Sequence, residues 1–328
     1  MTIETPDSSG LICSFVLQQE GAAVPLAWDT KFDPDSASGP IWLHFNLADT
    51  RASNWIAGCE AIPDDARDLL LDHDALARYE IADNGLALVI GDLHHDFNGD
   101  PEGFGTLRLY IDKHMLITGR RHPLMAVDQL RREMTHGAAI TNTTDLLARM
   151  IELLAATFQR VVKENADVVD DAEDQILAGY VRDQGAELGR VRRLLARLRR
   201  HVNGERHALS QSLARAHRWT GNADTSELRQ AVERLDGTAQ DLELVQERAR
   251  LLQEEIAGRL GEATNRNLYL LSVMTTVLLP INLITGIFGM NTGGLPWSHS
   301  EDGFWHAVIF MLIGITISLG FLRRNRIL

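Results

Sequence analysis

Two long segments near the end of this 328-residue chain, residues 267–300 and 303–322, contain no aspartate, glutamate, lysine or arginine. About 20 apolar residues cross the hydrocarbon core of a bilayer as a helix. We therefore expect transmembrane helices over 267–290 and 303–322, joined by a loop at 291–302. The arginines nearest the two helices lie at their far ends from this loop: Arg259, Arg266, Arg323, Arg324 and Arg326. The positive-inside rule then predicts a multi-pass protein of the cytoplasmic (inner) membrane, with both termini in the cytoplasm and the loop outside.

The rest of the chain has the composition of a soluble domain, and this composition excludes several functions. A net charge of −13 disfavours general nucleic-acid binding, which needs a basic face. Two cysteines are too few for a disulfide framework or a cysteine zinc site. We find no Gly-rich phosphate loop, nucleophile elbow or HExxH motif, and no cleavable signal peptide. We expect no enzyme activity and no permanently bound cofactor. The run His94-His95-Asp96 departs from a calcium loop at Pro101, which favours a solvated loop over a metal site.

Residues 1–136 alternate short β-type runs with helical stretches, which predicts a cytosolic α/β sandwich domain. The expected strands lie at 11–17, 41–45, 86–90, 107–111 and 116–118. The fold class is an α+β membrane protein that joins this domain to a long stalk helix and the two transmembrane helices. The remaining boundaries follow: a cytosolic helical region at 137–266, the membrane segments given above, and a basic cytoplasmic tail at 323–328.

The helical region contains a long pattern that begins near Thr225. Apolar residues there alternate at spacings of three and four, which is typical of a coiled-coil seam. They are Leu228, Val232, Leu235, Ala239, Leu242, Val245, Ala249, Leu252, Ile256, Leu260 and Ala263. No proline interrupts this pattern before Pro280. A helix from 225 to 290 would be about 99 Å long at about 1.5 Å per residue, the length of a stalk that continues into the membrane.

Charge is unevenly distributed within the helical region. Residues 143–179 carry 8 acids and 3 bases, whereas residues 180–218 carry 10 arginines and 3 acids. We interpret the arginine-rich stretch as a solvated face that pairs with the acidic helix before it. The acidic cluster is likewise interpreted as a solvated face, with a regulatory metal site as the alternative. Its members are Asp167, Asp170, Asp171, Glu173 and Asp174.

The first apolar segment carries polar residues on one predicted helix face. This face consists of Leu268, Leu271, Thr275, Leu279, Asn282 and Gly286. An amide in hydrocarbon is unfavourable unless it faces protein or water. Leucine rings alternating with Thr275 and Asn282 fit a pore with hydrophobic constrictions. Helix–helix packing, with Thr275 and Asn282 bonded between helices, fits equally well. Two spans cannot enclose a pore, so conduction requires a symmetric homo-oligomer.

The end of this segment reads Phe288-Gly289-Met290-Asn291. A Gly-Met-Asn triad here, followed by a short loop, a second span and a basic end, resembles the CorA-type divalent metal-ion transporter family. The resemblance extends over nearly the whole chain and is strongest to the ZntB zinc-transporter branch. It rests there on Asn291-Thr292-Gly293-Gly294-Leu295-Pro296 and, upstream, on Trp42-Leu43-His44-Phe45-Asn46.

The resemblance implies a homopentameric funnel whose pore is lined by the first transmembrane helix. Asn291 would place a ring of amide oxygens at the outer mouth and bind the hydrated ion, and Gly289 would permit a close backbone turn. Asn282 and Thr275 would form further polar rings, with Leu279, Leu271 and Leu268 as apolar collars. In the entrance loop, Glu301 and Asp302 would attract cations, and His299 is a candidate zinc ligand.

The sequence leaves two candidates for the transported ion. Zn²⁺ is the first candidate because the loop resembles the zinc branch. Mg²⁺, Co²⁺ or Ni²⁺ is the alternative, because Met290 stands between Gly289 and Asn291 as in magnesium-transporting relatives. A third hypothesis is a membrane-anchored coiled-coil scaffold that transports nothing. Direction of transport and coupling to protons stay open.

Overall fold

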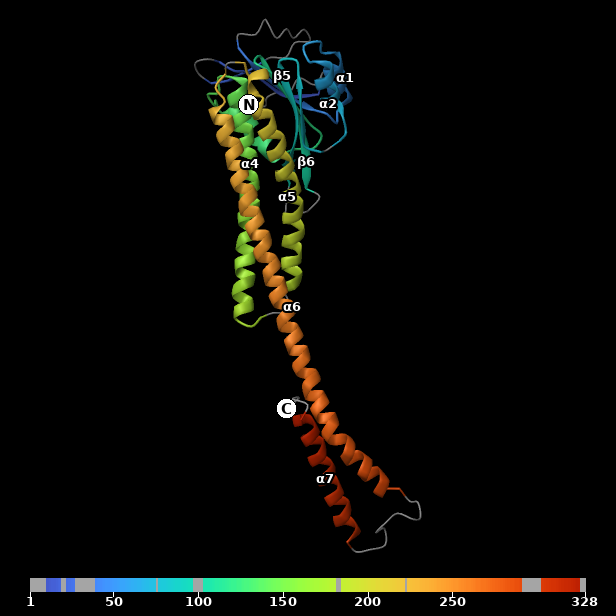
Figure 1. Cartoon of the computed structure of the whole chain (residues 1–328). Helices are drawn as coiled ribbons and strands as arrows, with labels where there is room; N and C mark the ends of the chain where they lie inside the picture. The colour runs from blue at the N-terminus through green and yellow to red at the C-terminus, as the bar shows by residue number, and fades with distance from the viewer. Residues whose placement is uncertain are drawn as a thin grey trace. The chain divides into compact units, whose positions relative to one another are not determined.

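The computed structural model describes residues 10–18, 22–26, 39–74, 76–96, 103–180, 184–221, 223–290 and 302–324 (Figure 1). The chain divides into two compact units, residues 1–252 and 253–328. Each unit is described by itself below, and the helix α6 belongs to both.

The first unit is built on a mixed sheet of seven strands in the order β2-β1-β3-β7-β6-β5-β4. β3 and β7 pair in parallel, and the other neighbouring strands that the structure describes pair antiparallel. The five predicted strands are confirmed as β1, β3, β5, β6 and β7. The strand bounds are β1 Leu11–Val16, β2 Val24–Pro25, β3 Ile41–Asn46, β4 Arg78–Ala82, β5 Gly85–Leu93, β6 Phe104–Ile111 and β7 Met115–Arg120.

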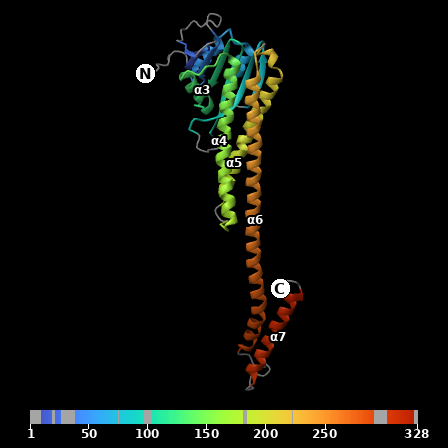
Figure 2. The same ribbon diagram turned by 90° about the vertical axis from the view of Figure 1, so that its left-hand side faces the viewer.

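Helices cover both faces of this sheet, which confirms the predicted sandwich. α1 (Thr50–Gly58) and α2 (Asp64–Leu71) lie on one face, and the long helices lie on the other (Figures 1 and 2). Side chains alternate between the faces of a strand, so Ile41, Leu43 and Phe45 of β3 share one core with α1 and α2.

The other face of β3 carries a buried polar network. The Arg120 Nε–H donates to His44 Nε2 at 3.1 Å, so the His44 proton lies on Nδ1, which donates to Thr118 Oγ1 at 2.8 Å. The Trp42 Nε1–H donates to the same oxygen at 2.9 Å. Arg120 also pairs with Asp128 of α3 (Met125–Thr135) at 3.2 Å. These bonds fix the β3–β7 pairing and attach α3 to it.

Three long helices pack against one another on the face of the sheet opposite α1 and α2. They are α4 (Thr143–Leu177), α5 (Gln184–Ala214) and the first part of α6 (Ser226–Phe288). A short 3₁₀ turn, η2 (Ala216–Arg218), follows α5. The predicted seam of α6 is buried from Leu228 to Ile256. Leu260 and Ala263, the last two residues of the predicted seam, are exposed in the single chain.

The pairing of the arginine-rich helix with the acidic helix stays a prediction. Ion pairs join each of these two helices to α6. Arg248 of α6 lies 2.6 Å from Asp170 and 2.8 Å from Glu173 of α4. Arg199 of α5 lies 3.3 Å from Glu243 of α6. α6 therefore carries charged partners for both helices.

The second unit is a helical hairpin. α6 continues through Pro280 to Phe288, and α7 (Gly303–Arg324) runs beside its final part in both views (Figures 1 and 2). α6 and α7 are the two described helices that are long and apolar enough to cross a membrane.

Candidate functional site on the first apolar helix

α7 covers one face of the final part of α6. Between residues 267 and 290 the half-buried residues fall on one side of the helix at about 100° per residue. They are Val273, Thr276, Val277, Pro280, Ile281, Ile284 and Phe288. The contact is close because α7 carries a glycine there: a Cβ built on Gly314 would lie 3.1 Å from Pro280 Cβ and 3.7 Å from Ile284 Cδ1. Thr285 lies near the edge of this contact, with Oγ1 at 3.8 Å from Met311 Sδ.

The predicted pore face lies on the opposite side of α6. Its centre is about 180° around the helix from the face that α7 covers. All six of its residues are exposed: Leu268, Leu271, Thr275, Leu279, Asn282 and Gly286. Leu279 has 66% of its surface exposed, Leu271 62% and Leu268 57%, so these leucines need another apolar surface or lipid. The structure thus places the six residues together and leaves them uncovered by their own chain.

The hydroxyl and amide groups in this segment differ in whether they have a hydrogen-bond partner within the helix. The Thr275 hydroxyl donates to the Leu271 carbonyl at 2.8 Å, and the Thr276 hydroxyl donates to the Ser272 carbonyl at the same distance. The Asn282 amide has no hydrogen-bond partner within the described residues. Two neighbouring threonines therefore have the same local bonding, but Thr275 lies on the uncovered face and Thr276 on the α7 side.

The helix ends in a tight backbone turn. The Gly289 N–H donates to the Thr285 carbonyl at 2.8 Å, and a Cβ built on Gly289 would lie only 2.9 Å from that oxygen. Met290 follows and is half exposed. The predicted residues Asn291, His299 and Glu301 lie outside the described residues.

Asp302 is exposed just before α7, and its carbonyl accepts the His306 N–H at 3.2 Å. From Asn267 to Phe288 the helix contains no aspartate, glutamate, lysine, arginine or histidine.

Two stretches of the cytosolic unit were considered above as metal sites: the run that begins at His94 and the acidic cluster on α4. Among the described residues, no three His, Cys, Asp or Glu side chains converge to hold a metal. The rings of His94 and His122 lie with their centroids 5.1 Å apart and are tilted by 46°, while His95 and Asp96 are exposed.

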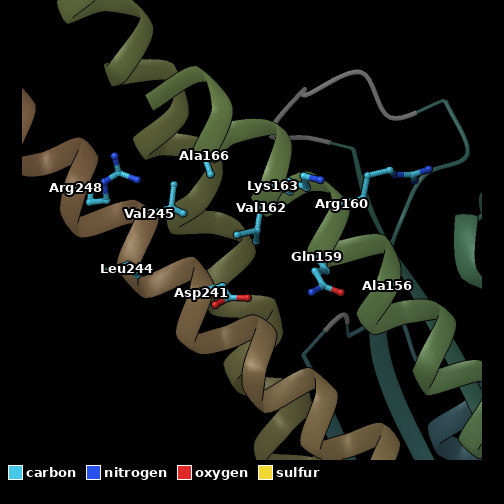
Figure 3. Close-up of a pocket in the computed structure, with 10 residues that line it drawn as sticks. All are labelled: Ala156, Gln159, Arg160, Val162, Lys163, Ala166, Asp241, Leu244, Val245 and Arg248. Carbon is cyan, nitrogen blue, oxygen red and sulfur yellow. The ribbon is translucent and has the colours of Figure 1, made fainter. Parts of the chain in front are cut away.

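The acidic cluster borders a groove between α4 and α6, in which Val162 and Ala166 face Leu244 and Val245 (Figure 3). Arg248 at the end of this groove pairs with Asp170 and Glu173, so an arginine already neutralises this part of the cluster.

Gly314 is not among the residues predicted from the sequence, although it sets the close contact between α7 and α6. Its signal was present: Gly314 and Ser318 are four residues apart, a small-residue spacing that lets membrane helices approach closely. Identifying the covered face of α6 required the position of α7.

Comparison with known proteins places these features in a family. The family model described as CorA-like Mg²⁺ transporter protein matches residues 37–324. The zinc transport protein ZntB of Pectobacterium atrosepticum is 24% identical over 318 residues, which are 97% of this chain and 96% of that protein. The divalent cation transporter CmaX of Pseudomonas aeruginosa is 27% identical over 315 residues, 94% of each chain.

Solved structures of proteins with related names have a similar fold. The full-length CmaX structure matches with a TM-score of 0.83 and 28% identity, over 98% of this chain and 100% of that one. The CorA magnesium transporter of Methanocaldococcus jannaschii matches in fold, with a TM-score of 0.68 and 17% identity over 95% of this chain and 98% of that one.

Proposed function

Because this chain belongs to the CorA-like Mg²⁺ transporter protein family, we propose that it carries divalent metal cations across the cytoplasmic membrane, with Zn²⁺ as the cargo. Several copies, most simply five, surround an axial pore lined by the exposed polar face of α6. The cytosolic unit and both ends of the chain lie on the cytoplasmic side. The similarity to a zinc transport protein and to a divalent cation transporter over nearly the whole chain supports this function.

The observation that carries the proposal is the position of Asn282. Its amide lies on the face of α6 that α7 leaves open, without a partner in the described part of its own chain. Leaving an amide unbonded in hydrocarbon costs several kcal/mol. A water-filled axis between copies supplies its hydrogen bonds, and the same arrangement covers the exposed leucines. A lone scaffold anchor would leave both the amide and the leucines in lipid.

The proposed pathway suits a small divalent ion. Neutral oxygens from Asn291, Asn282 and Thr275 bind the hydrated ion without holding it too tightly to leave. Leu279, Leu271 and Leu268 form narrow apolar collars that resist conduction when dry. Glu301 and Asp302, repeated in each copy, concentrate cations at the outer mouth. His299 is the proposed zinc-binding side chain of this loop.

Radioactive Zn²⁺ uptake into proteoliposomes tests the proposal. We expect Asn291→Ala and Asn282→Leu to reduce uptake at least tenfold, whereas Thr276→Val, on the α7 side, keeps it near the native rate. Repeating the assay with a pH gradient would determine whether protons contribute. Native uptake by Asn291→Ala, or equal losses in all three variants, would contradict the pore assignment.

Met290 supports one alternative cargo. Because Gly289-Met290-Asn291 has the residue of magnesium-transporting relatives at its centre, Mg²⁺, Co²⁺ or Ni²⁺ is the second candidate. Uptake of labelled Zn²⁺ in competition with each ion separates the two. Stronger competition by Mg²⁺ than by unlabelled Zn²⁺ would favour the alternative.

A further inference from the structure

Three exposed arginines lie at the cytoplasmic end of the helical hairpin. Arg266 belongs to α6, and Arg323 and Arg324 end α7. No aspartate or glutamate occurs in residues 263–300 or 303–328. The glutamate one turn before Arg266 makes no ion pair with it, and none of the three arginines pairs with any other residue that the structure describes. We call these three residues the arginine cluster. Its positive charge is not neutralised within the described part of the chain.

A contact between the two helices fixes the level of the cluster on α7. Met311 of α7 lies beside Thr285 of α6, with 3.8 Å between Sδ and Oγ1. The helices run in opposite directions (Figures 1 and 2), so twelve residues further along α7 and twelve residues back along α6 bring Arg323 level with Val273. Val273 is half-buried and Leu322 is buried, so both helices still have covered residues at this level.

Arg266 lies just beyond the end of α7, on the face of α6 that α7 covers. It precedes Val273 by seven residues, which is nearly two full turns and about 10.5 Å, so both side chains leave α6 on nearly the same side. The same count places Arg266 about 180° around the helix from Thr275 of the open face. Arg266 from α6 and Arg323 from α7 therefore border one space at the end of the hairpin. Arginine side chains extended from both helices span it.

Each arginine has an exposed apolar residue one turn nearer the middle of the membrane. A turn is three or four residues. The pairs are Arg266 with Leu270, Arg323 with Leu319, and Arg324 with Phe321. Tyr269, beside Leu270, is partly exposed at the same level, and tyrosines favour the headgroup region of a bilayer. Positive charge followed by apolar surface matches a phospholipid, in which a phosphate is followed by acyl chains.

We propose that the arginine cluster binds the headgroup phosphate of an anionic phospholipid in the cytoplasmic leaflet. The acyl chains of this lipid lie on the exposed apolar residues one turn further into the membrane. Guanidinium groups and phosphates form short, often bidentate hydrogen bonds. Basic pockets between transmembrane helices on the cytoplasmic side suit anionic head groups. The site requires that the hairpin crosses the membrane, but it requires neither the pore nor a particular cargo.

The bound phosphate joins the two helices. Arg266 and Arg323 carry like charges that repel each other across the end of the hairpin. A phosphate between them accepts hydrogen bonds from both helices. The lipid therefore holds the end of α7 against α6.

Native mass spectrometry of the full-length protein in a neutral detergent tests the site. The probes are phosphatidylglycerol and phosphatidylcholine with the same acyl chains. We expect the native protein to bind phosphatidylglycerol about tenfold more tightly than phosphatidylcholine. Arg266→Gln or Arg323→Gln should lower the affinity for phosphatidylglycerol about fivefold, because each removes one charge from the headgroup region.

Arg259→Gln is the matched control. It removes the same charge from α6 seven residues further from the membrane, where Arg259 pairs with Glu255 at 2.5 Å. This variant should bind phosphatidylglycerol like the native protein, and Arg266→Lys, which keeps the charge, should recover most of the affinity. Equal retention of both lipids, or equal losses in Arg259→Gln and Arg266→Gln, would overturn the proposal. Displacement of the lipid by excess free glycerol 3-phosphate would overturn the assignment to a lipid.

Photolabelling in proteoliposomes locates the acyl chains. Phosphatidylglycerol that carries a diazirine near the headgroup end of one chain should label Phe321. Phe304, at the other end of α7, is the internal control because it is equally open, with 70% of its surface exposed against 61% for Phe321. Equal labelling of the two phenylalanines would contradict the site. Both experiments count bound lipid without metal flux, so failure of this site is distinguishable from failure of the proposed function.

Discussion

The Gly91 N–H of β5 donates a 2.9 Å hydrogen bond to Oε1 of the fully buried Glu205 in α5. A Cβ built on Gly91 would lie 2.8 Å from that oxygen and 2.9 Å from Nδ1 of His201. The other Glu205 oxygen has no partner among the described residues. Burial raises the pKa of Glu205 well above its ordinary value, and neighbouring Asp92 raises it further. A carboxyl group that favours its neutral form therefore joins α5 to the sheet.

This relationship predicts how stability depends on pH. A carboxyl group with a raised pKa in the folded state costs stability as pH rises, because the unfolded chain ionises first. The loss from Glu205 begins near pH 4.5, its ordinary value, and continues towards its raised pKa. Asp92 adds a loss of the same sign between about pH 4 and about 7, because burial raises its pKa to about 7.

Glu205→Gln isolates the glutamate because a neutral amide still accepts the Gly91 N–H. His44, His94 and His201 have pKa values lowered by burial and give the opposite slope, but both proteins share them. We expect the melting temperature of the variant to rise relative to the native protein between pH 4.5 and 7.5. A constant difference across this range would show that Glu205 does not titrate differently on folding.

Gly91→Ala should destabilise the cytosolic unit. The added methyl group collides with both Glu205 and His201, and overpacking of this kind costs about 1–3 kcal/mol. Gly58→Ala is the control because a Cβ there meets nothing within 4 Å. Urea unfolding in detergent, followed by tryptophan fluorescence, measures both. Equal stability of the two variants would mean that α5 moves aside at no cost.

Thr118→Val should lower the stability of the protein more than the small change in side-chain volume suggests. It removes the acceptor of both the Trp42 and the His44 N–H groups in a buried site. Each buried donor left unbonded costs about 1–3 kcal/mol, so we expect the two donors together to cost about 2–6 kcal/mol of stability. Thr135→Val, at an exposed threonine bonded to its own helix, should change stability little. The same urea titration compares them, and a loss below about 1 kcal/mol for Thr118→Val would refute the network's role.

Gly314→Val should separate α7 from α6. A Cβ at Gly314 already lies 3.1 Å from Pro280, whereas one at Gly320 meets nothing within 4 Å. We expect Gly314→Val to lower both the folded yield and the metal uptake, while Gly320→Val leaves both near native levels. Folded yield comes from size-exclusion chromatography and uptake from the proteoliposome assay. Full uptake by Gly314→Val would show that this helix contact is dispensable.

Much of the fold could be predicted because its signals are local. The strands at 41–45 and 86–90 are dense in β-branched and large apolar residues, and the proline-free seam predicts α6 over nearly its whole length. β2 and β4 were missed because each is short and pairs at a sheet edge with little apolar pattern. The ion pairs that join α6 to both α4 and α5 were not predicted, because proximity in sequence favoured a pairing of α4 with α5. Tertiary packing placed α6 beside both helices.

Part of the candidate site could likewise be predicted from the sequence, and part required the tertiary structure. Helical spacing placed Thr275, Leu279 and Asn282 on one face, but periodicity alone left pore and packing equally supported. The position of α7, set by Gly314 against Pro280, determined which face remains open. Buried groups such as Glu205 gave no sequence signal, because a glutamate in an arginine-rich helix resembles any exposed residue.

The central claim is that the open face of α6 borders water, and two adjacent threonines test it. In a background without Cys13 and Cys59, Thr275→Cys and Thr276→Cys are each exposed to a charged, water-soluble methanethiosulfonate reagent in membranes. Reaction of Thr275→Cys that Zn²⁺ slows, with no reaction of Thr276→Cys, is the result we predict. Reaction at neither position, or at both equally, would contradict a water-filled path along this face.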